Sequence, residues 1–389
     1  MKNLWAEQDA DIFFNQARRL GISRQFADCV YASRLLGRET QLVQHGGGNT
    51  SVKLMVRAVD GTSVDAMFIK ASGYNLEQIT AEGFVGVNQS YLDSLKTQTN
   101  ISEELLTNAL GQARLSFSSP SPSVETLVHS FIPARYVFHT HPLAILALTN
   151  QKNGDELIQK AAGGKAIVLP YVMSGFPLAL QIYRALKDNK YHNTIVVLKH
   201  GVFTFGDTAK DTYDNMIKVV SKSEKFIRSI RKKLKTNRRK TPLKLKNLAP
   251  VLRGALITAS AKEQPCILSF RNSSIIKNFL GFGDVSRLIK CGPITPDHVI
   301  WTKPKALLLP SNCNSIEIVR GINNYIKDYE RYFEKNNSRY SGKKVMRDPL
   351  PRVIFVDGLG VFGVGESLAK ARIVSELAET FADIALKSE

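Results

Sequence analysis

The sequence predicts a mixed α/β protein, because segments with helical and strand periodicity alternate along its 389 residues. Apolar residues recur at helical spacing over residues 4–37 and 207–225. Short apolar segments typical of strands cover residues 51–56, 66–72 and 136–141. A chain of this length is expected to form two domains, and its apolar share of 43% is sufficient for sizeable cores.

Three histidines lie at the ends of two predicted strands. Residues two apart in a strand point to the same side, so His139 and His141 present two imidazoles to one point. His200 ends a second apolar segment, Ile195–His200. A catalytic Zn²⁺ requires such an arrangement: three neutral imidazoles bind the ion, a carboxylate lies nearby, and one position stays open for substrate. Taken singly, each histidine could instead be an ordinary core or loop residue.

Glycine and hydroxyl residues follow other predicted strands. Three consecutive glycines, residues 46–48, precede Asn49, and such glycines let backbone N–H groups converge on an anion. A hairpin turn alone would also favour glycine. Ser72 and Gly73 follow a strand and offer a hydroxyl group and a flexible backbone, although Ser72 could equally be an ordinary turn residue.

A short helix is predicted from Val124 to Ile132, with Pro122 before it and Ser123 as its N-cap. Glu125 and His129 lie four residues apart and therefore on one face of this helix. Glu125 could complement the helix dipole or act in catalysis, and the nearby histidines favour catalysis. We assign His129, one turn further along, to packing or to support of the site.

The net charge of +19 is unevenly distributed. Residues 222–246 contain twelve Lys or Arg residues against one acid, Glu224. The segment has a single aromatic residue, Phe226, and no nucleic-acid-binding motif beside it. We therefore expect a solvated helix end that continues into a linker, and no nucleic-acid partner. The remaining positive charge favours an anionic substrate.

No run of eighteen apolar residues is present, so no membrane span is expected. The N-terminal residues turn acidic from Glu7, where a signal peptide would be apolar. The spacing of the four cysteines fits neither a metal site nor a disulfide framework. The sequence thus predicts a cytoplasmic protein whose free thiols are Cys29, Cys266, Cys291 and Cys313.

In their order along the chain, these motifs resemble those of class II aldolases of the fuculose-phosphate and rhamnulose-phosphate type, a family that includes the adducin head domains. The matching segments are Gly46–Ser51, Ala71–Gly73, Pro122–Glu125, His139–Pro142 and His200–Gly206. The sequence is most similar to the aldolase portion of bifunctional rhamnulose-phosphate aldolase/lactaldehyde dehydrogenase proteins. Those proteins also have segments like Gly292–Val299 and Asp348–Val353, so the resemblance covers nearly the whole chain.

Two features depart from the family pattern. The bifunctional proteins continue into a short-chain dehydrogenase domain, whereas this sequence stops at Glu389. A separate aldehyde dehydrogenase is therefore a possible partner. In the fuculose-type motif two serines precede the glutamate, and Val124 replaces the second of them here, which removes one potential phosphate donor.

The resemblance implies a metal-dependent lyase of carbohydrate metabolism. Such an enzyme reversibly cleaves a ketose 1-phosphate, like rhamnulose or fuculose phosphate, to dihydroxyacetone phosphate and an aldehyde. The resemblance places the metal ion on His139, His141 and His200, where it stabilises an enediolate. The expected ion is Zn²⁺, with Mn²⁺ or Co²⁺ as alternatives.

The resemblance also assigns roles to the other motif residues. Glu125 is expected to act as general acid and base, with a pKa raised by burial. The residues expected to bind the phosphate are Asn49, Ser72, Gly73 and Ser123. No cofactor other than the metal ion is expected.

The fold implied by the resemblance is a three-layer α/β sandwich around a mainly antiparallel sheet, in a ring-like homo-oligomer with sites at subunit interfaces. Two alternatives to the aldolase remain. One is a sugar-phosphate 4-epimerase or dehydratase of the same family, and the other is a non-catalytic, adducin-like scaffold. The scaffold is disfavoured because adducin-type domains have lost metal ligands that this chain retains.

The second half of the chain repeats part of the first. Val137–Ala144 aligns with Val299–Ala306, and His200–Gly206 aligns with Leu359–Gly365. In this alignment Trp301, Lys303 and Leu359 replace the three histidines. We therefore expect a degenerate, metal-free partial repeat of the same fold.

The predicted domain organisation follows from these features: a catalytic domain at residues 1–221, a basic helix end and linker at 222–247, and the repeat at 248–389. The pattern Gly358-Leu-Gly360-Val-Phe-Gly363 matches a dinucleotide-binding fingerprint. That fingerprint needs a second strand ending in an acidic residue. Residues from Leu368 onward are predicted to form one helix, so we expect no dinucleotide.

Overall fold

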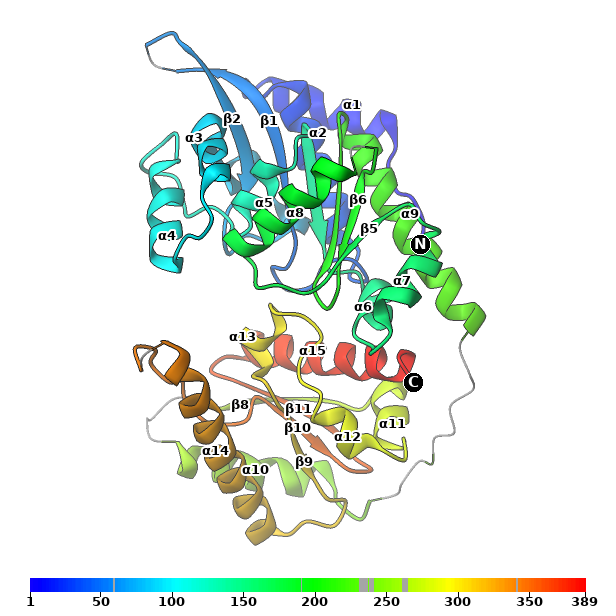
Figure 1. The fold of residues 1–389 in the computed structure, drawn as a ribbon. Coiled ribbons are helices and arrows are strands. Elements are labelled where there is room, and N and C mark those ends of the chain that lie inside the picture. Colours follow the sequence, from blue (N-terminus) through cyan, green and yellow to red (C-terminus); the bar gives the residue numbers. More distant parts are fainter. Residues whose placement is uncertain (59, 190, 231–236, 238–240, 261–264, 341) are drawn as a thin grey trace. The chain divides into compact units, whose positions relative to one another are not determined.

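The structure is a computed structural model, and it describes residues 1–58, 60–189, 191–230, 237, 241–260, 265–340 and 342–389. The chain divides into two compact units, Met1–Ile230 and Arg231–Glu389 (Figure 1). The predicted domain boundaries at residues 221 and 248 stay predictions, and residues 231–236 and 238–240 of the predicted linker lie outside the described residues. None of the described helices is both long enough and apolar enough to span a membrane.

A seven-stranded sheet in the order β3-β2-β1-β4-β7-β6-β5 forms the centre of the first unit. All neighbouring strands are antiparallel except β5 and β6. The strands are β1 (Asn49–Arg57), β2 (Ser63–Lys70), β3 (Phe84–Asn88), β4 (Tyr136–Thr140), β5 (Ile167–Leu169), β6 (Thr194–Val197) and β7 (Gly201–Gly206).

Helices cover both faces of this sheet (Figure 1). One face carries α1 (Glu7–Arg18), α2 (Arg24–Arg38), α6 (Leu143–Thr149), α7 (Gly154–Ala162) and α9 (Ala209–Ile230). The other carries α3 (Gln89–Ser94), α4 (Glu103–Gln112), α5 (Thr126–Phe131) and α8 (Phe176–Asp188). Short 3-10 turns complete the unit at η1 (Leu76–Gln78), η2 (Ala81–Gly83) and η3 (Leu95–Thr97).

Alternation along β4 and β7 produces these three layers. Val137 and Phe203 pack into a core shared with α5 and α8. Thr140 and Thr204 point to the other face, where their hydroxyl groups contact Met216 and Thr212 of α9. Since every residue of β4 is buried, this strand is covered on both sides, unlike the half-exposed strands of many antiparallel sheets.

The second unit is built on a four-stranded sheet in the order β8-β11-β10-β9. Its strands are β8 (Ile267–Arg271), β9 (Leu307–Leu309), β10 (Val353–Val356) and β11 (Gly360–Gly365). Helices again flank both faces: α10 (Leu245–Ala259) and α14 (Ser315–Asn337) on one, and α11 (Ser274–Leu280), α12 (Val285–Ile289) and α15 (Leu368–Lys387) on the other. The shorter elements are α13 (His298–Thr302) and η4 (Ser338–Tyr340).

The two sheets share one topology, because β8-β11-β10-β9 matches β4-β7-β6-β5 in order and in strand direction. The predicted fold class, a three-layer α/β sandwich followed by a partial repeat, is confirmed. The continuous helix predicted from Leu368 is present as α15.

The sequence alignment of the repeat is wrong for its first strand. His139 of β4 pairs with Phe203 of β7, and the equivalent pair in the second unit is Phe270 with Phe362. The counterpart of β4 is therefore β8 and not the segment Val299–Ala306, whose first four residues belong to the helix α13. The alignment failed because a short apolar segment does not by itself distinguish a helix from a strand.

The hairpin turns before β7 and β11 correspond closely. His200 N–H donates to the carbonyl oxygen of Val197 at 3.2 Å, and Leu359 N–H donates to that of Val356 at 3.0 Å. The residue before each has a left-handed backbone, with φ of 60° at Lys199 and 71° at Gly358. Leu359 is thus the counterpart of His200, as predicted.

Candidate metal centre

The sheet brings three histidines of the first unit together. One ring nitrogen from each of His139, His141 and His200 lies within 4.8 Å of the others, and all three residues are buried. His139 lies near the end of β4, His141 follows that strand, and His200 occupies the turn between β6 and β7. Among the residues that the structure describes, no other group of three His, Cys, Asp or Glu side chains has this geometry.

Hydrogen bonding prepares His139 to bind a metal ion. Its Nδ1 lies 3.0 Å from the carbonyl oxygen of Val202, which can only accept, so Nδ1 carries the proton. The unprotonated Nε2 then faces the Nε2 of His141 at 2.9 Å. The ring stacks on Phe203, with centroids 3.9 Å apart. A backbone carbonyl that fixes the tautomer is typical of metal-ligating histidines.

Two glycines make room for these rings. A Cβ atom at Gly201 would lie 2.7 Å from Cδ2 of His141 and 3.0 Å from Cε1 of His139. Gly48 has a φ of 70°, and a Cβ atom there would lie 2.8 Å from the carbonyl oxygen of His139. The glycine of the predicted anion loop therefore also permits close packing against β4.

The carboxylate of Glu125 faces the imidazoles from the start of α5. It is 4% exposed, with Oε2 3.3 Å from His139 Nε2 and Oε1 3.2 Å from His200 Nε2. The buried Nδ1 of His200 has no hydrogen-bond partner among the described residues. A catalytic metal site fits these groups: three imidazole nitrogens, one carboxylate and a buried ring nitrogen without a hydrogen bond.

The protonation states at this site differ from the sequence-based expectation in one respect. Burial lowers the pKa of His139 more than the adjacent Glu125 raises it, so this imidazole is neutral, as a ligand must be. Burial alone raises the pKa of Glu125, but the imidazoles of His139, His200 and His141 together lower it by more. The raised pKa expected for Glu125 is therefore wrong for the arrangement described here.

Two of the predicted phosphate-binding residues contact the carboxylate or each other. Asn49 pairs with His139 in the register of β1 and β4. Its side-chain Nδ2 donates to Glu125 Oε2 at 2.7 Å and to Ser123 Oγ at 3.2 Å. Asn49 and Ser123 are both buried.

Ser72 and Gly73 lie in the exposed loop that follows β2. This loop runs beside the segment that precedes Ser123, because Ser72 N–H donates to the carbonyl oxygen of Ser121 at 3.0 Å. Lys70, which sequence reasoning missed, is 4% exposed and its Nζ lies 3.4 Å from the carbonyl oxygen of Gly46. Its position at the end of β2, directly after the apolar residues Met67, Phe68 and Ile69, was the only signal.

Helix α5 begins later than predicted. Its first residue is Thr126, and Glu125 occupies the N-cap position. Ser123 accepts three hydrogen bonds in the preceding turn: Thr126 donates to its carbonyl oxygen from both N–H and Oγ1, and Glu125 N–H donates to its Oγ. The catalytic candidate thus sits at a helix terminus, where the backbone directs its side chain toward β4.

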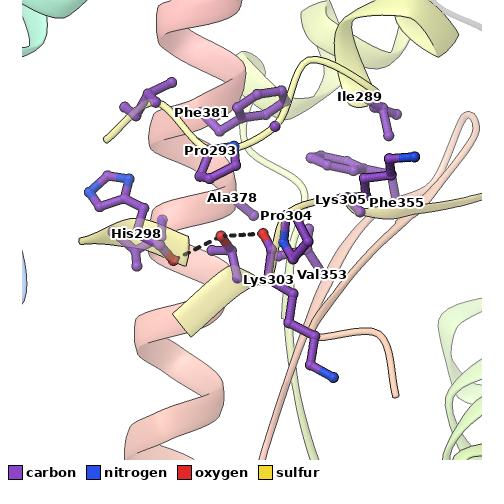
Figure 2. Close-up of a pocket in the computed structure, with 15 residues that line it drawn as sticks. Ile289, Pro293, His298, Lys303, Pro304, Lys305, Val353, Phe355, Ala378 and Phe381 are labelled. Carbon is purple, nitrogen blue, oxygen red and sulfur yellow. Dashed lines mark hydrogen bonds between the residues drawn. The ribbon is translucent and has the colours of Figure 1, made fainter. Parts of the chain in front are cut away.

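The second unit has a pocket of its own, shown in Figure 2. Apolar residues such as Pro293, Ala378 and Phe381 line it, together with His298. Its volume is about 30 Å³. His298 is the only histidine that lines it, and no group of metal-ligating side chains lies there among the described residues, so the histidine site of the first unit is the candidate functional site.

Both units of the chain match family models. A family model for the class II aldolase and adducin N-terminal domain matches residues 27–224, and one for the second domain of class II aldolases matches residues 243–389. The N-terminal class II aldolase domain of a conserved protein from Thermoplasma acidophilum is 37% identical. That match covers 58% of this chain and 99% of the other, with a TM-score of 0.52.

Two further relatives are more distant. The uncharacterized oxidoreductase YuxG of Bacillus subtilis (strain 168) is 27% identical over 380 residues, and the match covers 94% of this chain. The chain spans about half the length, 54%, of that relative. An L-fuculose-1-phosphate aldolase from Thermus thermophilus is 20% identical over 52% of this chain and 95% of its own, with a TM-score of 0.35. With its first unit matched along most of its length, the chain belongs to the class II aldolase and adducin family.

Proposed function

We propose that this protein is a zinc-dependent class II aldolase that reversibly cleaves a ketose 1-phosphate to dihydroxyacetone phosphate and an aldehyde. Class II aldolases are metal-dependent, and the chain has the triad of His139, His141 and His200. The observation that carries the proposal is the convergence of these imidazoles on the buried carboxylate of Glu125. Zn²⁺ is favoured because all three protein donors are imidazoles.

The metal ion, when bound by the three histidines, supplies Lewis-acid stabilisation of negative charge that develops on substrate oxygen atoms. Glu125 moves the proton to and from the substrate carbon through Oε1, since Asn49 holds Oε2. Burial of these side chains excludes water, which would otherwise compete for the proton.

The phosphate group of the substrate is proposed to bind where the loops containing Asn49, Ser72, Gly73 and Ser123 meet. Asn49 and Ser123 are already linked by a hydrogen bond, and the backbone of Ser72 is bonded to the segment before Ser123. These groups are neutral donors, and the chain's net charge of +19 favours approach of the dianion.

Three wider proposals accompany this function. The relative YuxG is named an oxidoreductase and is about twice as long as the matched region, which supports a dehydrogenase as the consumer of the aldehyde. Four cysteines that are free thiols support a reducing, cytoplasmic setting. We also propose a homo-oligomer, on the basis of the family resemblance alone.

The proposed function is tested by elemental analysis of the purified protein followed by a cleavage assay. We expect about one zinc per chain, and none in a His139→Ala/His141→Ala variant. His192→Ala is the matched control, because His192 lies in a loop outside the triad. Release of dihydroxyacetone phosphate from a panel of ketose 1-phosphates would then identify the sugar.

Three outcomes of this test separate the alternatives. Metal binding with aldehyde release supports the aldolase. Metal binding with interconversion or dehydration of a sugar phosphate, but no cleavage, would replace it with an epimerase or a dehydratase of the same family. Failure to bind or take up any divalent metal would contradict the proposal and favour a scaffold.

A further inference from the structure

Behind the carboxylate of Glu125, buried side chains form one continuous hydrogen-bonded series. The Oγ of Ser51 lies 2.8 Å from Nδ1 of His129, and Nε2 of His129 contacts Oδ1 of Asn49. The Nδ2 of Asn49 then donates to Oε2 of Glu125 at 2.7 Å. The residues come from β1 and from α5 with its N-cap, up to 80 positions apart in the chain.

We propose that Ser51 and His129 are positioning residues, which fix the side-chain amide of Asn49 and thereby the Glu125 carboxylate. This inference rests on the proposed function, because it assigns the series to the general acid/base. Ser51 and His129 are each 0% exposed, so water does not compete for their hydrogen bonds. In such surroundings an unmade hydrogen bond is costly, and one arrangement of the series is strongly preferred.

The direction of every hydrogen bond in the series follows from chemistry. The ionised carboxylate only accepts, so Asn49 must direct its NH₂ group toward Glu125. Its carbonyl oxygen Oδ1 then faces His129 and also only accepts, so Nε2 of His129 must carry the ring proton. Nδ1 is consequently unprotonated and accepts the hydroxyl proton of Ser51.

This order of protons has a consequence for Glu125. The amide of Asn49 cannot rotate by half a turn, because its oxygen would then face the carboxylate and its NH₂ group would face the N–H of His129. Oε2 is therefore held in place, whereas Oε1 faces His200. One oxygen atom of the general acid/base is restrained, and the other is presented to the reacting groups.

Burial keeps the series in this state over a wide pH range. The pKa of His129 is lowered to about 3, chiefly by burial, so the ring does not take up a second proton near neutral pH. A protonated ring would have to donate from Nδ1, and the Ser51 hydroxyl would then have to turn away.

The tautomer can be measured without any assay of activity. In a long-range ¹H–¹⁵N correlation spectrum of ¹⁵N-labelled protein, we expect His129 to show a protonated Nε2 and an unprotonated Nδ1. The signal is assigned by its loss in His129→Gln. A proton on Nδ1 would overturn the proposal, because Nε2 could not then donate to Asn49.

Variants separate positioning from packing. The amide nitrogen of Gln can replace the Nε2–H donor, so we expect His129→Gln to keep kcat within a few-fold of the wild type. Leu fills similar space without a donor, and His129→Leu is expected to lower kcat by about 10- to 100-fold with little change in zinc content. Equal kcat for the Leu and Gln variants, with both folded and metal-loaded, would overturn the proposal.

Ser51→Ala provides an independent test at the far end of the series. Without the hydroxyl group the ring loses one of its two hydrogen bonds, but the carbonyl oxygen of Asn49 still requires the proton on Nε2, so we expect the Nε2–H signal to remain and kcat to fall by less than in His129→Leu. Conversion of the ring to the Nδ1–H tautomer in Ser51→Ala with an unchanged kcat would contradict the mechanism. If the wild type neither binds metal nor cleaves a ketose 1-phosphate, the proposed function fails, while the tautomer result still reports on the series itself.

Discussion

The two units of the molecule share a four-strand arrangement but differ at the positions that carry chemistry. In the first unit His139 lies opposite Phe203, whereas in the second Phe270 lies opposite Phe362. Even the steric requirement is repeated. A Cβ atom at Gly360 would lie 2.7 Å from the Phe270 ring and 2.5 Å from a backbone oxygen. Gly201 is required for the same reason, because a Cβ atom there would overlap with β4.

The comparison shows that the strand arrangement does not depend on the three histidines. Where Thr140 packs against α9 in the first unit, Arg271 in the second pairs with Glu376 at 2.6 Å and with Glu379 at 2.7 Å on α15. Phe270, Asn272 and Leu359 occupy the positions of the three histidines, and the strand order is unchanged. The three histidines are therefore not needed to specify this sheet.

The largest expected effect comes from replacing His139 of the first unit by phenylalanine, the residue at the equivalent position of the second unit. His139→Phe places the Phe270 side chain at the metal site, and we expect loss of bound metal and a fall in kcat of about 10³-fold or more. Circular dichroism should show that the fold is retained. Elemental analysis checks the metal content.

The reciprocal variant Phe270→His is the control for this exchange. It should leave the metal content at one ion per chain, because Leu359 and Asn272 occupy the other two ligand positions of the second unit. A second bound ion in Phe270→His, or an unaltered metal content in His139→Phe, would contradict the conclusion that these positions distinguish the two units.

The two glycines should be equally intolerant of a side chain. Gly201→Ala and Gly360→Ala each create an overlap with backbone and ring atoms, and each should lower the free energy of unfolding by about 1–3 kcal/mol. Only Gly201→Ala should also weaken metal binding. Urea unfolding and metal titration measure the two effects, and an unaffected Gly360→Ala would show that the second unit is packed differently.

Acid should act on the first unit through His129. Its pKa is about 3 when folded against an ordinary value of 6.5, so below pH 6.5 the unfolded chain binds the extra proton. Stability is then lost as the pH falls toward 3, by about 1.4 kcal/mol per pH unit. The difference in unfolding free energy between the wild type and His129→Gln, measured from pH 6.5 to 4.5, isolates this effect. A constant difference would contradict it.

Alkali should act on the second unit through Lys303. Burial lowers its pKa to about 8 from 10.5, although Asp348 partly opposes the shift. Between these values the unfolded chain binds more protons, so stability rises with pH by at most about 1.4 kcal/mol per unit. Lys303→Met should remove that rise in unfolding experiments from pH 8 to 10. The same slope in both proteins would show that the ammonium group is not buried as described.

Much of the fold and site could be read from the sequence because the information was local. Alternation within β4 places His139 and His141 on one side, the glycines before Asn49 mark a tight turn, and Gly201 after His200 permits close approach to β4. These features need only the two-residue period of a strand and the absence of a Cβ atom.

What the sequence could not reveal depends on pairing between distant segments. The contact of Asn49 with Glu125 joins residues 76 positions apart, through the pairing of β1 with β4. The same pairing places Ser51 and Asn49 of β1 beside His129. The spacing of His129 from Glu125 in the sequence could not show whether His129 supports the site or only packs in the core. The strand β8 was missed because Phe270 retains none of the polar character that identifies β4.

The left-handed turn before β7 and β11 has a consequence for protein engineering. The first unit accepts Lys199 at a φ of 60°, which costs a non-glycine residue about 1 kcal/mol, and the second unit uses Gly358 at 71°. Because the backbone path is common to both, the tripeptides Lys199–Gly201 and Gly358–Gly360 form an interchangeable cassette. Grafting the second into the first would delete one imidazole and relax the turn in a single step, giving a more stable chain without the third metal ligand.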